Sequence, residues 1–300
     1  MIKAFPKIFA VGQRYVQDIF EDEVEVTEKI DGSQFSVAKI DNELIFRSRG
    51  RIQQQDCPDK LFKEGIDYLL SVKDKIPNDT QFYMEYLKKS NHNVLSYGRI
   101  PKNHFVLFGV YFFKEDRFLS KSQMLSSYAD MIDIESVPVL FKGKIENFEE
   151  LKKMLQTTSF LGKSKIEGIV IKNYHKDLML GGHIIPIMCA KYVSEEFKEV
   201  HDKNWKREKT VKGRWETFKE KYQTEARWLK SLFYLRDNGE LEESPKDIGK
   251  LMKRVNLDIT EECKEEICEF LWKEFSRELL RQSTKGLAEW YKEYLAKNNF

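Results

Sequence analysis

Short apolar runs separated by turn residues fill the chain from residue 1 to about residue 199. The runs are only a few residues long and are rich in β-branched and aromatic side chains, which is typical of strands. The predicted strands include Val24–Thr27, Gln34–Ile40, Glu43–Ser48, Gln81–Leu87, His104–Phe113, Gly168–Lys172 and Ile184–Tyr192. Asp41-Asn42, between the second and third of these runs, predicts a hairpin turn.

Between the strands lie segments whose apolar residues recur every three or four positions, which predicts amphipathic helices. These segments are Lys60–Lys75, Ser120–Ile132 and Phe148–Gln156. Strands and helices mixed in this way indicate an α+β domain built on antiparallel sheet.

Beyond about His201 the strand patterns stop and only helical ones remain. We predict helices over Trp215–Arg236, from Thr260 to about Leu280, and from Ser283 or Thr284 to Leu295. Ser244-Pro245 is typical of a helix N-cap followed by a proline in the first turn. We therefore predict an all-α C-terminal domain, residues 206–300, after an α+β domain, residues 1–205.

Composition narrows the classes of protein that remain possible. The 300 residues are 41% hydrophobic and 33% charged, with a formal net charge of +2. This supplies ample apolar material for a core and excludes a histone-like polycation, so a surface for nucleic acid would be a local patch. The chain has no apolar run of about 20 residues, the length of a membrane-spanning helix. With no Cys-x-x-Cys pair, a reduced cytoplasmic setting without membrane partners is expected.

The candidate chemistry begins at Lys29, in the segment Glu28-Lys29-Ile30-Asp31-Gly32-Ser33, just after the first predicted strand. A lysine amine bonds to phosphorus only if it is held deprotonated beside a bound nucleotide. Taken alone, a lysine, an acid and a glycine at this spacing are far more typical of a surface turn. The motifs that follow, in a fixed order, favour the nucleophile.

Three later residues have the chemistry to bind a nucleotide. Arg49, in Arg47-Ser48-Arg49-Gly50-Arg51, can hold a phosphate or ribose oxygen through two hydrogen bonds, or it is a solvated strand end. Glu85 is either a sugar-hydroxyl acceptor or an outward-facing strand residue. Phe108 can stack on a purine, which contributes about 1–3 kcal/mol, or it belongs to the core. Alternation alone does not select Phe108 over Val106.

The most specific motif is Glu167-Gly168-Ile169-Val170-Ile171-Lys172. Glu167 would organise a divalent cation, through water, because Mg²⁺ sheds its hydration reluctantly. Lys172 would neutralise an α-phosphate. Lys191, at the end of an apolar strand, would neutralise the negative charge of the same phosphate. Either lysine alone would be an ordinary strand-end residue. Both, arriving after Glu167, indicate one shared site.

These cations also bear on the protonation of Lys29. The unperturbed pKa of a lysine is about 10.4. Lys172, Lys191 and a metal ion would disfavour the ammonium form, and we therefore expect a lowered pKa for Lys29. The same cations would stabilise the transition state and the pyrophosphate leaving group.

Together these residues resemble the covalent nucleotidyltransferase superfamily of ATP-dependent ligases and capping enzymes, and most closely its RNA ligase 2 type. The strings that carry the resemblance are EKIDGSQFSV, FRSRG, FYMEY, FVLFGVYFF, IEGIVIK and AKYVSEEFKE, in the order of the six family motifs. They span about the first 200 residues. The resemblance implies an ATP-grasp-like ligase domain of antiparallel sheet, followed by the helical domain.

The resemblance also implies roles for individual residues. Lys29 would carry AMP through a phosphoramidate bond, and Glu167 would serve the metal. The remaining residues would line the nucleotide site: Arg49 and Glu85 at the ribose or the ligated strand, Phe108 on adenine, Lys172 and Lys191 at the α-phosphate, and Glu28 and Gln34 in the pocket. Many family members have a second lysine two residues after the last motif lysine, where this chain has Val193.

The implied function is an ATP-dependent RNA ligase of RNA repair or processing, with Mg²⁺ or Mn²⁺. It would seal 5′-phosphate and 3′-hydroxyl RNA ends through lysyl-AMP and RNA-adenylate, and a monomer is expected.

Three other readings compete with this one. A DNA nick-sealing ligase and a GTP-dependent capping guanylyltransferase usually carry a small β-barrel, which the helical tail argues against. A non-catalytic module that binds nucleic-acid ends is disfavoured by the intact Lys29, Glu167 and Lys191. The basic stretch from Lys203 to Trp215 is either a track for a phosphate backbone or a solvated linker.

Overall fold

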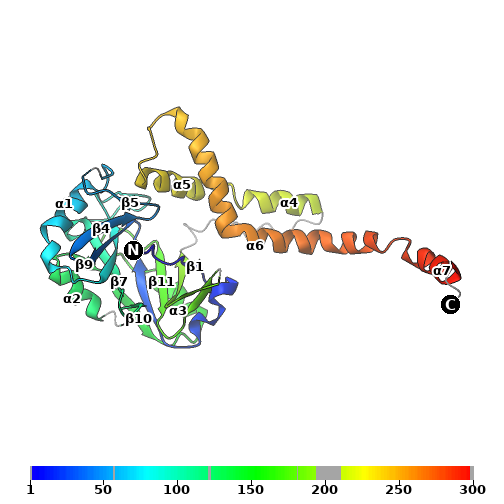
Figure 1. Cartoon of the computed structure of the whole chain (residues 1–300), viewed down its shortest axis with the longest axis horizontal. Helices are drawn as coiled ribbons and strands as arrows, with labels where there is room; N and C mark the ends of the chain where they lie inside the picture. The colour runs from blue at the N-terminus through cyan, green and yellow to red at the C-terminus, as the bar shows by residue number, and fades with distance from the viewer. Residues whose placement is uncertain (1, 57, 121–122, 181, 194–210, 298–300) are drawn as a thin grey trace. The chain divides into compact units, whose positions relative to one another are not determined.

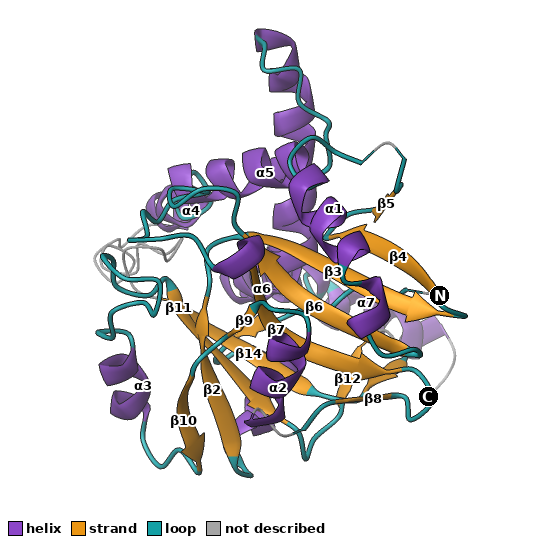
Figure 2. Ribbon diagram, turned by 90° about the vertical axis from the view of Figure 1, so that its left-hand side faces the viewer, coloured by secondary structure: helices purple, strands orange, loops and turns teal. Residues whose placement is uncertain are grey.

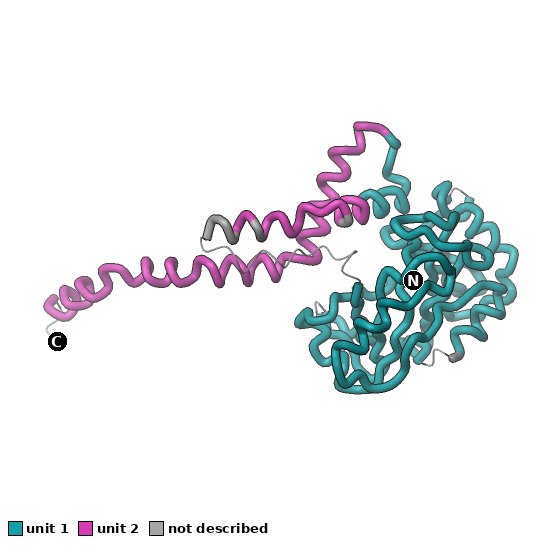
Figure 3. Tube along the Cα trace, turned by 180° about the vertical axis from the view of Figure 1, so that it is seen from behind, with its two compact units in different colours: residues 1–198, 232–243 teal, residues 199–231, 244–300 magenta. Residues whose placement is uncertain are grey.

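A computed structural model describes residues 2–56, 58–120, 123–180, 182–193 and 211–297 (Figure 1). The chain divides into two compact units (Figure 3). The first unit contains Met1–Lys198 and Leu232–Glu243, and the second contains Glu199–Ser231 and Ser244–Phe300. The boundary predicted at residue 205 and the basic stretch Lys203–Arg207 lie outside the described residues. The grouping of residues 232–243 with the first unit was not anticipated from the sequence.

The first unit contains two large sheets, which are antiparallel except for two short parallel pairs (Figure 2). The first sheet has the order β1 (Phe9–Ala10), β14 (Met188–Val193), β11 (Gly168–Asn173), β2 (Val24–Lys29), β10 (Val139–Gly143). The second has the order β5 (Ile52–Gln53), β4 (Glu43–Ser48), β3 (Ser33–Ile40), β6 (Thr80–Tyr86), β7 (Phe105–Phe112), β8 (Arg117–Phe118), and β9 (Glu135–Ser136) pairs with β7. A separate hairpin joins β12 (Leu178–Leu180) and β13 (His183–Ile185). The predicted α+β class is confirmed.

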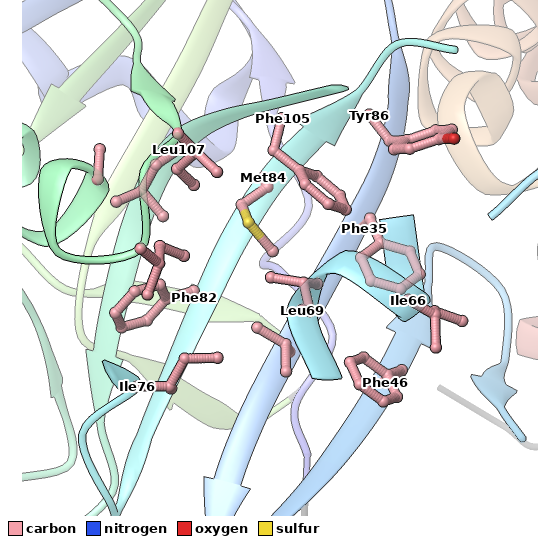
Figure 4. Close-up of a cluster of buried hydrophobic side chains, with 14 of the residues drawn as sticks. Phe35, Phe46, Ile66, Leu69, Ile76, Phe82, Met84, Tyr86, Phe105 and Leu107 are labelled. Atoms are coloured by element: carbon pink, nitrogen blue, oxygen red, sulfur yellow. The ribbon is translucent and has the colours of Figure 1, made fainter. Parts of the chain in front are cut away.

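Helices cover one face of each sheet. Side chains of α1 (Lys63–Ser71) and α2 (Gln123–Met131) join those of β3, β4, β6 and β7 in a buried cluster (Figure 4). The first sheet packs in the same way against α3 (Phe148–Met154) and the 3₁₀ helix η1 (Arg14–Phe20). Short 3₁₀ turns, η2 (Lys73–Lys75) and η3 (Lys102–His104), complete the unit.

Strand alternation decides which residues remain on the other face of each sheet. In β6, Phe82, Met84 and Tyr86 belong to the cluster under α1 and α2, so Tyr83 and Glu85 point the opposite way. Tyr83 packs in a smaller cluster with Ile187 and Cys189. Ile187 directly precedes β14 of the first sheet, and Cys189 lies within β14. The uncovered faces of the two sheets therefore approach each other, and this inner space holds the polar residues.

Turn chemistry sets the strand ends. Asp41 and Asn42 have φ values of 51° and 63°, the left-handed pair that a tight hairpin turn requires, and the predicted turn is confirmed. The predicted strand Ile184–Tyr192 is wrong in extent, because it is divided into β13 and β14 at Pro186. Proline lacks the N–H that a central strand must donate.

The second unit is helical where it is described. Its elements are α4 (Val211–Glu220), part of α5 (Glu225–Asp237), η5 (Pro245–Asp247), α6 (Ile248–Ser283) and α7 (Leu287–Lys297). Ser244 forms the predicted N-cap, with a capping box to Asp247 and proline in the first turn. The predicted helix start at Thr260 is wrong, because its hydroxyl donates to the Asn256 carbonyl within α6. The single helix predicted over Trp215–Arg236 is interrupted between α4 and α5.

A buried charged network joins α5 to α6 in this unit. The Arg227 guanidinium pairs with Asp258, and Lys230 lies 2.7 Å from both Asp258 and Glu262. Phe218 of α4 stacks on Phe270 of α6 at a centroid distance of 4.0 Å. Among the described helices, none has the length and apolar character to cross a bilayer.

Candidate active site

The inner face of the first sheet carries three of the predicted lysines. Alternation sends Val24 and Val26 of β2 into the cluster under α3, which leaves Lys29 on the inner face. Lys172 of β11 and Lys191 of β14 are set on this face by the same rule. Lys29 pairs with Gly168, and Lys172 pairs with Glu25, so the two lysines lie four residues apart along the sheet, roughly 13 Å between backbone positions.

Gly168 is where the strands meet most tightly. A Cβ at this position would lie 2.6 Å from the Tyr192 carbonyl oxygen and 2.9 Å from the Val193 Cα. Only glycine permits this approach of β14. Because Gly168 pairs with both Lys29 and Val193, these three residues form one cross-strand row.

Lys29 is held by Glu167, whose Oε2 lies 2.7 Å from Nζ. Burial by itself would lower the pKa of Lys29, but Glu167, Asp31 and Glu85 together raise it above the ordinary lysine value. The expected lowering of the Lys29 pKa is therefore wrong for this arrangement. The surrounding carboxylates outweigh burial, and Lys172 and Lys191 do not reverse the balance.

Glu167 is half-buried, and this partial removal from water raises its pKa, with Lys29 opposing the rise. Lys191 acts on the same carboxylate as a weaker, opposing positive charge. The structure thus brings Lys29, Glu167 and Lys191 together electrostatically.

Glu85 faces this pair from the second sheet. Its Oε2 is buried without a hydrogen-bond partner, and burial raises its pKa to about 8, with Lys29 opposing the rise and Glu167 adding to it. The turn after Lys29 passes directly beside it, because a Cβ on Gly32 would lie 3.2 Å from Glu85 Oε2 and 2.9 Å from Leu87. An unpartnered buried carboxylate is costly for folding and marks a place where a ligand can bind.

Gln34 and Arg49 meet at a small cavity of the second sheet. Gln34 pairs with Glu85 across the strands. The cavity is lined by Ala4, Phe5, Gln34, Ser36, Arg47, Ser48, Arg49 and Tyr83. Of the three arginines in this turn, Arg51 is bound to Asp59, whereas Arg47 has a buried Nε without a hydrogen-bond partner. Arg47 therefore also has an unused donor in the cavity.

Phe108 and Lys172 contact each other at the far end of the inner space. Lys172 Nζ donates to the Phe108 carbonyl oxygen at 2.5 Å, and burial lowers the pKa of Lys172. The Phe108 ring meets Phe5 edge to face at 5.0 Å and lies 6.4 Å from Tyr83. Phe108 is thus one wall of an aromatic group to which the N-terminal segment contributes.

Glu28 points away from the other predicted residues. Its carboxylate accepts hydrogen bonds from the Ser159 hydroxyl and from the Phe160 backbone N–H, the latter at 3.1 Å. Burial raises the pKa of this carboxyl group. Its side chain therefore fixes the loop that precedes Glu167 and does not reach the inner space, as strand alternation next to Lys29 requires.

Asp31 is a residue of the site to which the sequence assigned no role. Its Oδ2 accepts from the backbone N–H groups of Val94 at 2.8 Å and Leu95 at 2.7 Å. Its own N–H donates to the Tyr97 hydroxyl at 2.8 Å. Asp31 therefore ties the turn after Lys29 to a loop more than 60 residues away, and only its fixed spacing from Lys29 signals this in the sequence.

The oxygen atoms of this site suit a hard divalent cation. Glu85 and Glu167 converge near Lys29, and Glu85 Oε2 is an orphaned acceptor. Mg²⁺ is commonly held by one or two carboxylates with water and substrate phosphates completing its shell. Among the described residues there is no cluster of three or more acidic, His or Cys side chains that would enclose a metal by itself. The residues fit a cation shared with a substrate.

Glu85 generates a testable pH dependence of stability. A carboxyl group with a pKa of 4.5 when unfolded and about 8 when folded favours folding below pH 4.5, and this contribution is lost as pH rises toward 8. We therefore expect Glu85→Gln to gain stability relative to the wild type over this window, by about 2–4 kcal/mol at pH 8. Urea unfolding of both proteins at several pH values measures the difference, and Glu43→Gln, an exposed acid, is the control. A pH-independent difference would contradict the assignment.

Comparison with known proteins places the fold. In solved structures the chain resembles the Naegleria gruberi RNA ligase with PPi, at 18% identity and a TM-score of 0.51. A mutant of that ligase with ATP and Mn gives the same identity and TM-score. Each match covers 67% of this chain and 58% of the other, so this chain corresponds to less than two thirds of those proteins. At this identity the likeness shows the fold alone.

Two further comparisons bear on the family. No curated protein matches the chain. The family model "RNA ligase" matches residues 22–193, which include Lys29, Glu85, Glu167 and Lys191 and make up more than half of the 300 residues. The chain therefore belongs to the RNA ligase family.

Proposed function

We propose that this protein is an ATP-dependent RNA ligase that seals 5′-phosphate and 3′-hydroxyl ends through Lys29. The observation that carries the proposal is the part-buried contact of 2.7 Å between Lys29 Nζ and Glu167, with the unpartnered Glu85 Oε2 beside it. A half-buried lysine surrounded by carboxylates is unusual for a structural role, and the family match supports its use as a nucleophile.

In the first step the Lys29 amine attacks the α-phosphorus of ATP. The P–N bond forms as the bond from the α-phosphorus to the pyrophosphate oxygen breaks, and the amine loses its proton. Lys191 and Lys172 lie on the same sheet face as Lys29 and neutralise charge that develops on the α-phosphate.

Lys29 must first lose the proton that Glu167 stabilises. A divalent cation held by Glu167 and Glu85 would supply charge neutralisation for the phosphates and would compete with the ammonium for these carboxylates. Once Glu167 no longer pairs with Lys29, burial is the dominant influence left, and it lowers the lysine pKa. The same carboxylate thereby holds Lys29 in the resting state and releases it for reaction. Two structures of the Naegleria gruberi RNA ligase contain ATP and Mn, which supports this choice of ligands.

The base and ribose are assigned to the second sheet. Phe108 offers a ring for adenine, and Gln34 and Arg49 line the cavity next to Glu85. Arg47, with its unused buried Nε, is an additional donor to a phosphate or hydroxyl oxygen. Glu28 acts on the loop at Ser159 and not on the nucleotide.

The remaining steps return Lys29 to its starting form. A 5′-phosphate oxygen of RNA attacks the phosphorus of lysyl-AMP, the P–N bond breaks, and the amine regains a proton. The RNA 3′-hydroxyl then attacks the 5′-phosphorus, loses its proton and displaces AMP. The helical second unit favours this route over a DNA ligase or capping enzyme with a β-barrel.

We expect the wild type to form a covalent adenylate on Lys29. Incubation with labelled ATP and Mg²⁺ or Mn²⁺, followed by denaturing electrophoresis, should label the polypeptide, and labelled GTP should not. Lys29→Ala should remove the label, because no other amine occupies that row of the sheet. Lys39→Ala, a buried lysine that donates to the Lys73 carbonyl, is the matched control. Labelling of Lys29→Ala at the wild-type level would overturn the proposal.

Glu167 should be required for the metal-dependent step. We expect Glu167→Ala to reduce lysyl-AMP formation by at least about 100-fold, since it removes both the partner of Lys29 and a cation ligand. Titration of Mn²⁺ in a single-turnover labelling assay measures the rate and the metal requirement. Glu25→Ala serves as comparison, because it removes a buried acid from β2, on the same face of the sheet as Lys29. Near-normal, metal-dependent labelling in Glu167→Ala would remove the metal assignment.

The preference for RNA over DNA is tested with substrates that carry the same 5′-phosphate and 3′-hydroxyl ends. We expect sealing of nicked duplex RNA or of single-stranded RNA with a 5′-phosphate, and weak or no sealing of a nick made only of DNA. Accumulation of RNA-adenylate when the 3′-end is deoxy would identify the second intermediate. A preference for all-DNA nicks would replace the RNA ligase proposal by a DNA ligase.

A further inference from the structure

The turn that follows Lys29 is held from outside by a second loop. Asn93 Nδ2 donates to the Gly32 carbonyl oxygen at 2.8 Å and to Asp31 Oδ1 at 3.2 Å. His92 Nε2 lies 2.8 Å from the Ser33 hydroxyl. With the two backbone bonds to Asp31, this loop makes contact with each of the residues 31–33. The loop therefore contacts the whole of the turn that follows Lys29.

Arg236 fixes that loop to the turn. Its Nη1 donates to the His92 carbonyl oxygen at 3.0 Å, and its Nη2 donates to Asn93 Oδ1 at 2.8 Å and to Ser33 Oγ at 3.2 Å. Asn93 is consequently a bridge, because its oxygen accepts from Arg236 while its nitrogen donates to Gly32. A planar guanidinium can make all three bonds at once, whereas an ammonium cannot match this geometry.

The surroundings of Arg236 hold its side chain in one orientation. Asp237 Oδ1 accepts from Arg236 Nε at 3.0 Å and lies 2.8 Å from Nη2, so the two hydrogens of Nη2 are shared among Asp237, Asn93 and Ser33. The Phe233 ring lies 4.8 Å from the guanidinium carbon. Asp237 also bonds to Ser33 and lies within electrostatic reach of Arg49 and Glu85. The guanidinium is thus pre-organised, and little side-chain entropy remains to be lost in positioning the turn.

His92 completes the network as a neutral ring. Its Nδ1 accepts from the Lys88 backbone N–H at 3.0 Å, which assigns the proton to Nε2, beside Ser33. Burial and the adjacent Arg236 lower the pKa of His92 to about 3. Because the ring stays uncharged, this part of the network does not depend on pH in the neutral range.

We propose that Arg236 is a positioning residue for the nucleophile: through Asn93, His92 and Ser33 it fixes the turn, residues 31–33, that follows Lys29 at the end of β2. The proposal rests on the proposed function of Lys29 as the adenylated residue. Arg236 belongs to residues 232–243, which are part of the first unit. In the sequence, however, these residues lie between the two parts of the helical second unit. The catalytic turn is thereby completed by a segment outside the matched family region, residues 22–193.

The experiment measures lysyl-AMP formation at saturating ATP in the full chain. We expect Arg236→Ala to slow the single-turnover rate by about 10- to 100-fold, since displacement of a nucleophile by about 1 Å can cost that much. The Kd for ATP should change by less than about threefold, because Arg236 contacts the turn and not the nucleotide. Arg236→Lys should restore part of the rate. Arg14→Ala, which removes an arginine bonded to Tyr15 on the opposite side of the first sheet, should leave it unchanged.

A double-mutant cycle with Asn93→Ala tests the path. The effects of Arg236→Ala and Asn93→Ala should be less than multiplicative, because each breaks the same bridge to Gly32. Amide hydrogen exchange at Val94 and Leu95 should quicken in Arg236→Ala, and this readout needs no activity. A wild-type adenylation rate in Arg236→Ala, or unchanged exchange at both amides, would overturn the positioning role. An unlabelled wild type would instead overturn the proposed function, and the exchange measurement would still decide whether Arg236 holds the turn.

Discussion

The ion pair between Lys29 and Glu167 is the interaction on which the rest of the site depends. Two opposite charges that are partly removed from water are stable only while each compensates the other. Their contact requires the end of β2 to lie beside the start of β11, and this in turn requires a glycine at position 168, where β14 comes within 2.6 Å of a side-chain position. The packing of three strands thus sets the distance between one amine and one carboxylate.

The electrostatic balance around Lys29 is asymmetric. Glu167, Asp31 and Glu85 all act to keep the amine charged, and burial acts against them. A protein that only needed a stable core would gain by replacing such a group with apolar residues of similar volume. The cost of keeping Glu85 unpartnered and Lys29 charged is explained if both meet a cation and a phosphate during the reaction, since these ligands satisfy the acids and free the amine. Without these ligands, the folded protein is then less stable than it would be with apolar residues at these positions.

Alternation is a local rule, so it gives the sheet face of residues in regular strands, but it does not select Phe108 over Val106 in β7, whose pairing with β6 is irregular at this point. Val26 and Glu85 could each be assigned to a face from their neighbours alone, and the order of the motifs indicated which strands share a site. Contacts made by loops could not be predicted from the sequence. The bond from Asp31 to Leu95 and the contact of Arg236 with His92 join residues 64 and 144 positions apart, and no local pattern records them. For the same reason Thr260 was misread, since a hydroxyl followed by two acids is typical both of a helix start and of a helix interior.

Val193 shows how one strand row constrains the proposed chemistry. It shares the row of Lys29 and Gly168, so a lysine there would place a second ammonium beside the nucleophile. With valine instead, the nearest lysine on β14 is Lys191, one row further along the face, where it acts on Glu167. A charge in that position is better placed to neutralise a phosphate bound between the sheets than to lower the pKa of Lys29 directly. In the proposed mechanism, a cation bound by Glu167 would therefore release the Lys29 proton, because it would break the ion pair at the end of β2.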